Sequence, residues 1–401
     1  MEPKFVIVMG RNYTSRLGMI RAAGKAGYKV AVIKTDKNKK TASTPERIDA
    51  ASKYVEPGMY YYIKEPDDEE LINILMKDLA ETSYKPILLP TDDYTAAVID
   101  KNLDKLSQYF KMPNCEMKQG MAVYHMDKAH QKELAKAAGL NVAEGYSAEY
   151  DAASGKYILP EGVVYPVFIK PEVSFQGSKH MMQRCDNAEQ LEKVLGELDG
   201  SQNGTVLIEQ FIEIEKEYDI PGVSDGCDTY LPGVIEKGLI YLGVTGTGTM
   251  YDSSKLQDAI DKLRTMINGI HFTGLVDIEL YESKGVVYFN ELNMRFGASG
   301  FAMTNSGINM PYILMKTLDS EDGRFAPDDI KDHVTEGTFA SEKVCFQKYL
   351  SGQLSWKEYK KTIDKADFTF VEYDKDPKPG DAFRFYKMGA RVKKVIKKIK
   401  K

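Results

Sequence analysis

Two short stretches of the sequence carry acidic and amide side chains at every second residue. Asp277 and Glu279 form the first stretch, and Glu291, Asn293 and Arg295 form the second. Residues two apart in a strand point to the same face, so each stretch would align its polar side chains. If the two strands pair, their carboxylate and amide oxygens suit Mg²⁺, and the arginine could neutralise a transferred phosphoryl group. A solvated strand face is the alternative.

Two lysines are candidates for holding phosphate groups. Lys170 lies at the end of an apolar predicted strand, and Gln176, Gly177 and Ser178 form a small turn shortly after it. A lysine beside a glycine loop can hold ATP phosphates, because the ammonium supplies charge and backbone N–H groups bind oxygens. Lys128 begins a predicted helix. Taken singly, each lysine is equally compatible with an ordinary surface position.

A third segment has the features of a nucleotide pocket. Glu209, Gln210, Phe211 and Ile212 end a buried strand, and Glu217 follows shortly after. Backbone groups here could contact an adenine edge, the apolar side chains could support the ring, and a carboxylate could bind the ribose. A connector with solvated carboxylates is the alternative.

The helices and strands that must position these residues form more than one unit. The first unit runs from residue 1 to about 112. Predicted strands and helices alternate there, over residues 5–9, 17–27, 28–34, 70–80 and 85–93. Alternation of this kind predicts a parallel, helix-covered sheet of Rossmann-like type.

Two loops of this first unit are candidates for ligand contact. The loop Gly10–Gly18 lacks the GxGxxG spacing, so we expect no dinucleotide there. It is either a tight strand-to-helix turn or an anion site at a helix N-terminus, helped by Arg11 or Arg16. Residues 91–93 follow a strand end, where open sheets usually keep their ligand crevice, and residues 295–309 are a third candidate for substrate contact.

The pattern of predicted helices and strands changes from about residue 113. A helix over 127–140 is predicted, with Asp127 as its N-cap and Gly139 at its end. Strands follow over 163–171, 181–185, 205–212 and 217–223, with a helix over 187–198, and the strands 272–282 and 285–295 turn at 283–285. This order predicts a mostly antiparallel sheet with helices on one side, in an α+β unit that runs to about residue 325. In the extension 326–401, we expect a helix over 355–363 and a turn over 376–380.

Composition limits the function classes. The chain has 401 residues, 43% hydrophobic and 28% charged, which is typical of two or three packed domains. A net charge of −5 gives no field for nucleic acid, so we expect no nucleic-acid partner. The four widely spaced cysteines are expected to be reduced thiols, and the absence of a signal peptide or a membrane-spanning run predicts a cytoplasmic protein.

The order and spacing of these motifs resembles the ATP-grasp superfamily of carboxylate–amine ligases over about residues 1–325. The resemblance is nearest to the branch of D-aspartate ligase and the carbamoyl-phosphate-synthase large chain. It is carried by the segments PTDDYTA (90–96), FIKPEVSFQGS (168–178), FNELNMRFGAS (289–299) and SGINMP (306–311). The resemblance implies a Rossmann-like domain over 1–112 and an ATP-grasp domain of two α+β subdomains over 113–325, with a lid at about 125–210.

The resemblance also implies roles for the residues that contact ATP. Lys128 and Lys170 would contact the phosphates, with the loop Ser174–Ser178 covering them. Glu209 and Ile212 would contact adenine, and Glu217 would bind the ribose.

The metal site follows from the same resemblance. Glu279, Glu291 and Asn293 would bind Mg²⁺, and Arg295 would stabilise the phosphoryl group, while the role of Asp277 stays open. The implied cofactors are ATP and two Mg²⁺ ions, which Mn²⁺ could replace.

The implied reaction joins a carboxylate to an amine. The carboxylate would attack the γ-phosphate to give an acyl phosphate and ADP, and the amine would then displace phosphate. The acid could be an amino acid and the acceptor a cell-wall precursor or small peptide. Two alternatives stay open, namely nucleotide binding without turnover and a ligase with a non-amine acceptor. Dimers are common among the relatives, so a homodimer is a further expectation.

The C-terminal segment 390–401 is basic and amphipathic. Val392, Val395, Ile396 and Ile399 recur at helical spacing among lysines. This segment is either a terminal helix docked on the body or a site of weak attraction to an anionic membrane or a polyanionic precursor.

Overall fold

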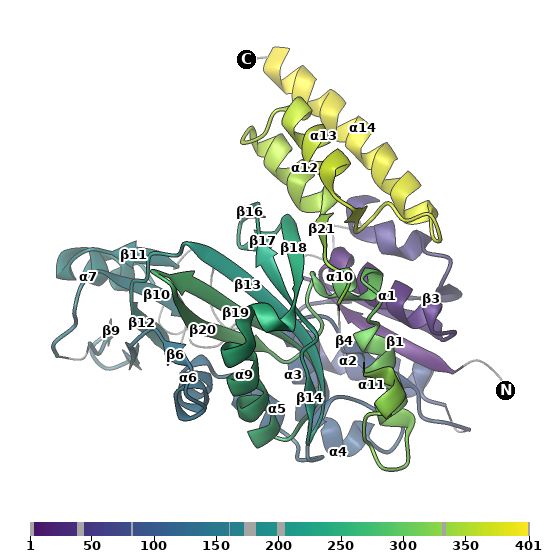
Figure 1. The fold of residues 1–401 in the computed structure, drawn as a ribbon, viewed down its shortest axis with the longest axis horizontal. Helices are drawn as coiled ribbons and strands as arrows, with labels where there is room; N and C mark the ends of the chain where they lie inside the picture. The colour runs from purple at the N-terminus through teal and green to yellow at the C-terminus, as the bar shows by residue number, and fades with distance from the viewer. Residues whose placement is uncertain are drawn as a thin grey trace.

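The computed structural model describes residues 4–37, 44–81, 83–159, 161–171, 182–198, 205–330 and 334–399. Its first unit is a four-stranded parallel sheet in the order β3-β2-β1-β4, shown in purple and blue in Figure 1. The strands are β1 (Phe5–Gly10), β2 (Lys29–Asp36), β3 (Val55–Lys64) and β4 (Ile87–Pro90). The helices are α1 (Tyr13–Lys25), α2 (Asp68–Ile74), α3 (Asp93–Lys101) and α4 (Leu103–Leu106). The predicted parallel sheet is confirmed, although β3 was not predicted.

The glycine loop expected over residues 10–18 is much shorter in the structure. Strand β1 ends at Gly10 and helix α1 begins at Tyr13. Asn12 is the N-cap, because its side chain accepts a hydrogen bond from the Thr14 backbone N–H. The local capping interaction therefore starts the helix several residues before the apolar spacing suggested.

A small antiparallel sheet forms the second unit, drawn in teal at the left of Figure 1. Its order is β11-β10-β12-β7, and its strands are β7 (Gly145–Ala148), β10 (Val167–Pro171), β11 (Gln183–Cys185) and β12 (Val206–Gln210). Helix α7 (Ala188–Gly196) packs on it through Leu191, Val194 and Leu195.

A ten-stranded sheet forms the centre of the molecule. Its main path is β22-β21-β18-β15-β13-β19-β20-β6, and β5 and β14 join from the side. The strands that matter for the site are β13 (Lys216–Asp225), β15 (Gly233–Lys237), β18 (Thr247–Asp252), β19 (Phe272–Ser283) and β20 (Val286–Asn293). Strands β19 and β20 pair antiparallel and turn at Lys284 and Gly285, both with positive φ, which confirms the predicted strand pair.

Helices cover both faces of this large sheet. Helices α6 (Lys128–Ala137) and α9 (Gln257–Gly269) pack on one face. Helices α10 (Gly300–Asn305) and α11 (Met310–Asp319) lie between the other face and the first unit. The predicted N-cap of α6 is confirmed, because the Asp127 side chain accepts from the His130 N–H. The expectation that helices lie on one side only is wrong, because the first unit supplies an apolar second face.

The C-terminal extension is a helical group, drawn in yellow at the top of Figure 1. It contains α12 (Glu342–Ser351), α13 (Trp356–Lys365) and α14 (Lys378–Ile399), and β21 (Gly337–Ala340) and β22 (Phe368–Thr369) join it to the large sheet. The helix expected over 355–363 is confirmed. The turn expected over 376–380 is wrong in its last three residues, because Pro379 lies in the first turn of α14, where its missing N–H needs no partner.

Two further expectations concern the chain's surroundings. Within the described part of the chain, every helix is too short or too polar to cross a bilayer. All four cysteines are free thiols, three of them buried, as the sequence analysis expected.

Candidate functional site

The large sheet brings the acidic stretches together on one face. Asp277 lies directly opposite Asn293, and Glu279 lies opposite Glu291 in the β19–β20 pair. On the other side of β19, Glu279 lies opposite Asp219 of β13. Because alternate residues of a strand share a face, three neighbouring strands present these side chains together, and we call this set the carboxylate face.

Arg295 closes the carboxylate face at one end. Its guanidinium donates to Asn293 Oδ1 at 2.8 Å and lies 3.3 Å from Asp277 Oδ2. Its Nε lies 3.0 Å from Asp93 Oδ1, at the start of α3. Asp93 lies three residues after β4, so the strand end at which a ligand crevice was expected contributes a side chain to the site. Burial opposes the guanidinium charge, but Asp93 and then Asp277 outweigh it and raise the pKa of Arg295.

Gly297 allows the chain after β20 to pass close to Asp277. A Cβ atom on Gly297 would lie only 1.9 Å from Asp277 Oδ2. The glycine is therefore required by this close approach.

Lys237 is a site residue that the sequence analysis missed. It ends β15, and its ammonium lies 2.9 Å from Asp219, 3.2 Å from Glu279 and 3.7 Å from Glu217. Burial works against its charge, and the carboxylates, Asp219 first, raise the pKa of Lys237 overall. The only sequence signal was its place at the end of a strand, which many surface lysines share.

Three lysines gather beside the carboxylate face. Lys128, the first residue of α6, lies 3.3 Å from Glu291. Lys170 lies 2.9 Å from Glu209 and donates to Asn290 Oδ1 at 3.4 Å. Of the two lysines that the sequence analysis singled out, Lys128 thus contacts a predicted metal ligand, and Lys170 contacts Glu209 and Asn290.

The third lysine is Lys132, which the sequence analysis did not name. It follows Lys128 by one helical turn, and its ammonium contacts the carboxylate of Glu209 and donates to the Ala143 carbonyl at 2.8 Å. Burial lowers the pKa of Lys132 to about 8, against the attraction of Glu209 and with the repulsion of Lys170. Its spacing of four from Lys128 was the available signal.

The segment that was predicted to bind adenine makes several contacts within the protein. Gln210 ends β12, and its N–H and that of Phe211 donate to the carbonyls of Glu144 and Pro166. The Phe211 ring is covered by the guanidinium of Arg184 at 4.5 Å. Ile212 follows in a connector, half-buried. The segment therefore links the small and large sheets, and two of its backbone donors are already engaged within the protein.

Glu209 and Glu217 lie on different parts of the site. The Glu209 carboxylate points toward the two buried lysines and is itself buried. Glu217 lies on β13 beside Lys237 and is about one third exposed. Their expected contacts with adenine and ribose stay predictions. The phosphate loop Ser174–Ser178, with Gln176 and Gly177, lies outside the described residues.

The carboxylate face suits a cation. Burial first, and then the nearby Asp219, raise the pKa of Asp277 to about 8, and burial also raises the pKa of Glu279. Asp277 Oδ1 is buried and has no hydrogen-bond partner among the described residues. An acidic oxygen in this state is satisfied by a metal ion or by a proton.

The side chains of the carboxylate face would share a metal ion with ligands from another molecule. Within the described residues, no three carboxylate, imidazole or thiol groups are placed to hold a metal ion by themselves. The predicted set contains an amide, Asn293, and Mg²⁺ in proteins commonly keeps waters and takes phosphate oxygens. Glu279, Glu291 and Asn293, together with Asp277, therefore fit Mg²⁺ that is bound jointly with a nucleotide.

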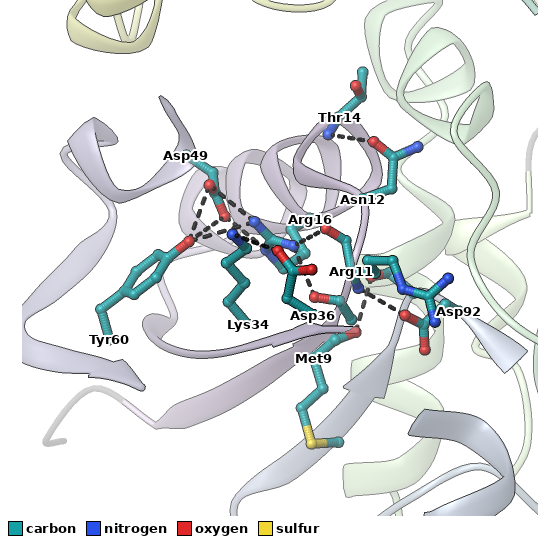
Figure 2. A network of polar contacts seen from close by, with 12 residues as sticks. Met9, Arg11, Asn12, Thr14, Arg16, Lys34, Asp36, Asp49, Tyr60 and Asp92 are labelled. Atoms are coloured by element: carbon teal, nitrogen blue, oxygen red, sulfur yellow. Dashed lines mark hydrogen bonds and ion pairs between the residues drawn. The ribbon is translucent and has the colours of Figure 1, made fainter. Parts of the chain in front are cut away.

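The turn between β1 and α1 is held by internal ion pairs, as Figure 2 shows. Arg16 is completely buried, binds Asp49 at 2.7 Å, and donates to the Gly10 and Arg11 carbonyls. Arg11 pairs with Glu65. These contacts favour the tight-turn interpretation of this loop, because both arginines that could have held an anion bind carboxylates of the protein.

Part of the chain is similar to proteins of known family. Residues 127–237 match the family model described as "Carbamoyl-phosphate synthase L chain, ATP binding domain". The carbamoyl phosphate synthase large chain of Neisseria meningitidis serogroup A is 30% identical over 145 residues. That match covers 34% of this chain and 13% of the relative, so the chain spans only a small part of that protein.

Solved structures show the same fold over most of the chain. The L-amino acid ligase from Bacillus licheniformis has a TM-score of 0.60 and 16% identity, covering 84% of this chain and 79% of that one. The biotin carboxylase domain of the Hydrogenobacter thermophilus 2-oxoglutarate carboxylase, a complex with MgADP and bicarbonate, has a TM-score of 0.60 and 17% identity. It covers 84% of this chain and 73% of that one. The chain therefore has the ATP-grasp fold, and its residues 127–237 are similar to the ATP-binding domain of the carbamoyl phosphate synthase large chain.

Proposed function

We propose that this chain, as a member of the ATP-grasp superfamily, is an ATP-dependent ligase that activates a carboxylate as an acyl phosphate and joins it to an amine. The observation that carries the proposal is the register of β19 and β20, which places Glu279 opposite Glu291 and Asp277 opposite Asn293. The same strands place Glu291 3.3 Å from Lys128 and Arg295 3.3 Å from Asp277.

The side chains divide between two tasks. Lys128, Lys132 and Lys170 supply positive charge for the ATP phosphates, next to Glu291 and Glu209. Mg²⁺ bound with the nucleotide supplies Lewis-acid stabilisation of the phosphoryl group. Asp277, Glu279, Glu291 and Asn293 would hold it, which assigns Asp277 a role as a ligand.

Arg295 is placed to stabilise charge that develops during the transfer. It is held by Asp93, Asp277 and Asn293, so its guanidinium is fixed before the reaction begins. A fixed charge of this kind lowers a barrier because little reorganisation is needed in the transition state. Catalysis then depends on positioning and electrostatics, with no covalent nucleophile from the protein.

The acid is proposed to be an amino acid, as in the amino-acid ligase of the same fold. The finer resemblance to D-aspartate ligase makes a cell-wall precursor or a small peptide a reasonable acceptor. The biotin carboxylase domain of the same fold makes bicarbonate an acid that must be tested beside the amino acids. Nucleotide binding without turnover, and a non-amine acceptor, are the alternative functions.

The test is Mg²⁺-dependent ADP release, measured over amino acids and bicarbonate, each with and without amine acceptors. The wild-type chain should release ADP fastest when one acid and one amine are both present, and mass spectrometry should find their amide. Glu291→Gln should reduce this rate by about a hundredfold or more, because it removes a charge from the shared metal site.

The matched control is Glu282→Gln, on the opposite face of β19, where Gln can still accept the hydrogen bond from the Tyr218 hydroxyl. It should release ADP at the wild-type rate. Unchanged ADP release in Glu291→Gln would refute the site. Tight ATP binding without product from any acid would favour the non-catalytic alternative.

A further inference from the structure

A cavity of about 210 Å³ lies where four distant segments of the chain meet. Its lining includes Asn12 and Thr14 at the start of α1, and Thr245 from β17 (Val244–Thr245). Ala298, just after β20, and Lys343 from α12 complete the set that matters here. The C-terminal helical group thus forms part of a cavity whose other walls come from the first unit, the separate two-stranded sheet that contains β17, and the segment after β20.

The cavity shares a wall with the carboxylate face. The Thr245 hydroxyl lies 3.4 Å from Asp219 Oδ2, and Asp219 is the carboxylate opposite Glu279. Ala298 directly follows Gly297, which packs against Asp277. A molecule in the cavity would therefore lie next to the proposed reaction site.

One end of the cavity is electropositive. Lys343 lies there, donating to Asn12 Oδ1 at 2.9 Å and lying 4.4 Å from the centre of the Tyr13 ring. Lys343 is also in the first turn of α12, whose N-cap Ser341 makes no side-chain capping bond. The first-turn N–H groups of a helix carry partial positive charge, which adds to that of the ammonium.

A buried hydroxyl group, that of Thr14, also lines the cavity. Thr14 is only 4% exposed, and its Oγ1 has no hydrogen-bond partner among the described residues. Thr14 lines the cavity, so its hydroxyl is available to a ligand atom or a water molecule there. This observation is independent of the charge on Lys343 and the helix terminus.

The opposite end offers a hydrogen-bond acceptor. There the Thr245 hydroxyl donates its proton to Asp219, whose carboxylate also pairs with Lys237, so the hydroxyl oxygen can accept a hydrogen bond from an ammonium group. Roughly seven water molecules would fill a volume of this size, since each takes about 30 Å³ in the liquid. That is room for one small amino acid together with several water molecules, and it is below the volume of a drug-sized pocket.

We propose that this cavity binds a small α-amino acid as the amine substrate, with its carboxylate at Lys343 and Thr14 and its amine at Thr245, beside the carboxylate face. The proposal rests on the proposed ligase function and gives it a substrate class and a second site. Lys343 then makes the C-terminal extension part of substrate binding.

The test is titration calorimetry on the full chain, with and without Mg²⁺ and the ATP analogue AMP-PNP. The probes are glycine, alanine and aspartate in both hands, each paired with its C-terminal amide, and inorganic phosphate. At least one free amino acid should bind saturably, and its amide should bind about tenfold or more weakly, because the charged carboxylate is lost. Phosphate binding tighter than every amino acid would overturn the assignment.

Two variants and two matched controls locate the binding. Lys343→Met should weaken amino-acid binding by about tenfold or more, and Thr14→Val by several-fold. The first control is Lys360→Met, an exposed lysine of α13. The second is Thr304→Val, which removes another buried hydroxyl without a partner, away from the cavity. Both controls should bind as the wild type does, and all four variants should keep the wild-type affinity for AMP-PNP.

The outcomes separate the two proposals. If AMP-PNP binds but every amino acid fails, or if Lys343→Met and Thr14→Val bind amino acids normally, the cavity assignment is wrong and the ligase proposal stands. If an amino acid binds in a manner that depends on Lys343 and Thr14 but AMP-PNP does not bind, the cavity assignment holds and the ligase proposal fails.

Discussion

At the scale of single residues, the arrangement around Glu209 has consequences for pH. Lys132 and Lys170 both contact its carboxylate, in a region where all three side chains are buried. One carboxylate balances only one of the two ammonium charges. Burial disfavours the second ammonium charge and lowers the pKa of Lys132 to about 8, and the repulsion of Lys170 acts in the same direction. ATP phosphates would supply the missing negative charge.

We predict that Glu209→Gln lowers the pKa of Lys132 further and that Lys170→Met raises it, because the first change removes an attraction and the second a repulsion. The measurement is NMR titration of ¹³C-methylated lysines, with the signal assigned by its absence in Lys132→Arg. A pKa near 10.5 in the wild type, or one that neither variant moves, would contradict the arrangement.

The lowered pKa of Lys132 also makes the free energy of unfolding depend on pH. Between pH about 8 and 10.5, the ordinary pKa of a lysine, folded Lys132 binds fewer protons than it does in the unfolded chain. The contribution of Lys132 to stability therefore rises with pH across this window. Below pH 8 both states are protonated, and its contribution is constant.

Gly297 gives a second prediction at the residue scale. Gly297→Ala should lower the rate of ADP release by tenfold or more, on the order seen when a catalytic group is misplaced by about an ångström. The added Cβ would displace the Asp277 carboxylate, which it would approach to 1.9 Å. Gly269→Ala is the control, because nothing lies within 4 Å of a Cβ there. A fully active Gly297→Ala would show that Asp277 is not needed.

At the scale of elements, helix α14 presents its apolar side chains in an unexpected direction. Its docked face carries Phe383 and Tyr386, and Arg391 lies 3.7 Å from the centre of the Trp356 ring. The residues Val392 and Ile396, which the sequence analysis noted, are 59% and 46% exposed. With Phe385 and Met388 they form an exposed stripe at spacings of three and four residues. The tail is therefore docked, but through a different face from the apolar one that its sequence shows.

We propose that the exposed stripe, Phe385, Met388, Val392 and Ile396, binds an anionic membrane weakly with the help of neighbouring lysines. The full chain should co-sediment with vesicles that contain phosphatidylglycerol, and less so at high salt. Replacing Val392 and Ile396 by serine should reduce the bound fraction several-fold. Serine at Ile158 and Val164, two exposed apolar residues elsewhere, should leave it unchanged. Equal binding by both double variants would reject a membrane role for the stripe.

At the scale of the whole molecule, the first unit and the C-terminal extension are joined through buried charge. Arg21 of α1 binds Asp376 at 2.9 Å, and both side chains are inaccessible to solvent. Arg21 also donates to the carbonyls of Phe370 and Val371, whose N–H groups donate to the buried carboxylate of Glu342. These contacts fix α12, and with it the Lys343 wall of the cavity, against α1.

We predict that Arg21→Met lowers the free energy of unfolding by about 3–5 kcal/mol, because it leaves the Asp376 carboxylate buried and unpaired. Adding Asp376→Asn to this variant should recover part of the loss, since the uncompensated charge is removed. Urea denaturation followed by circular dichroism gives both values. The control is Arg264→Met, which removes a partly exposed arginine paired with Asp261 on α9 and should change stability by less than about 1 kcal/mol. A loss in Arg21→Met no larger than in this control would contradict the argument.

The sequence by itself determined the features that depend on neighbouring residues. Alternation over 272–295 and a short turn fixed both the β19–β20 pair and the shared face of Asp277, Glu279, Glu291 and Asn293. The Asp127 cap fixed the start of α6 and thereby Lys128. Period-two and helical patterns are local, so they can be read from one chain.

Only the tertiary structure decided which distant groups meet. Lys237 joins Glu279 across 42 residues, Lys132 joins Glu209 across 77, and Arg21 joins Asp376 across 355. The cavity between α1 and α12 is of the same kind, because Thr14 and Lys343 are ordinary residues until the chain brings them together. Such contacts depend on the packing of whole units, for which a single sequence carries no periodic signal, whereas strand and helix patterns repeat within a few residues.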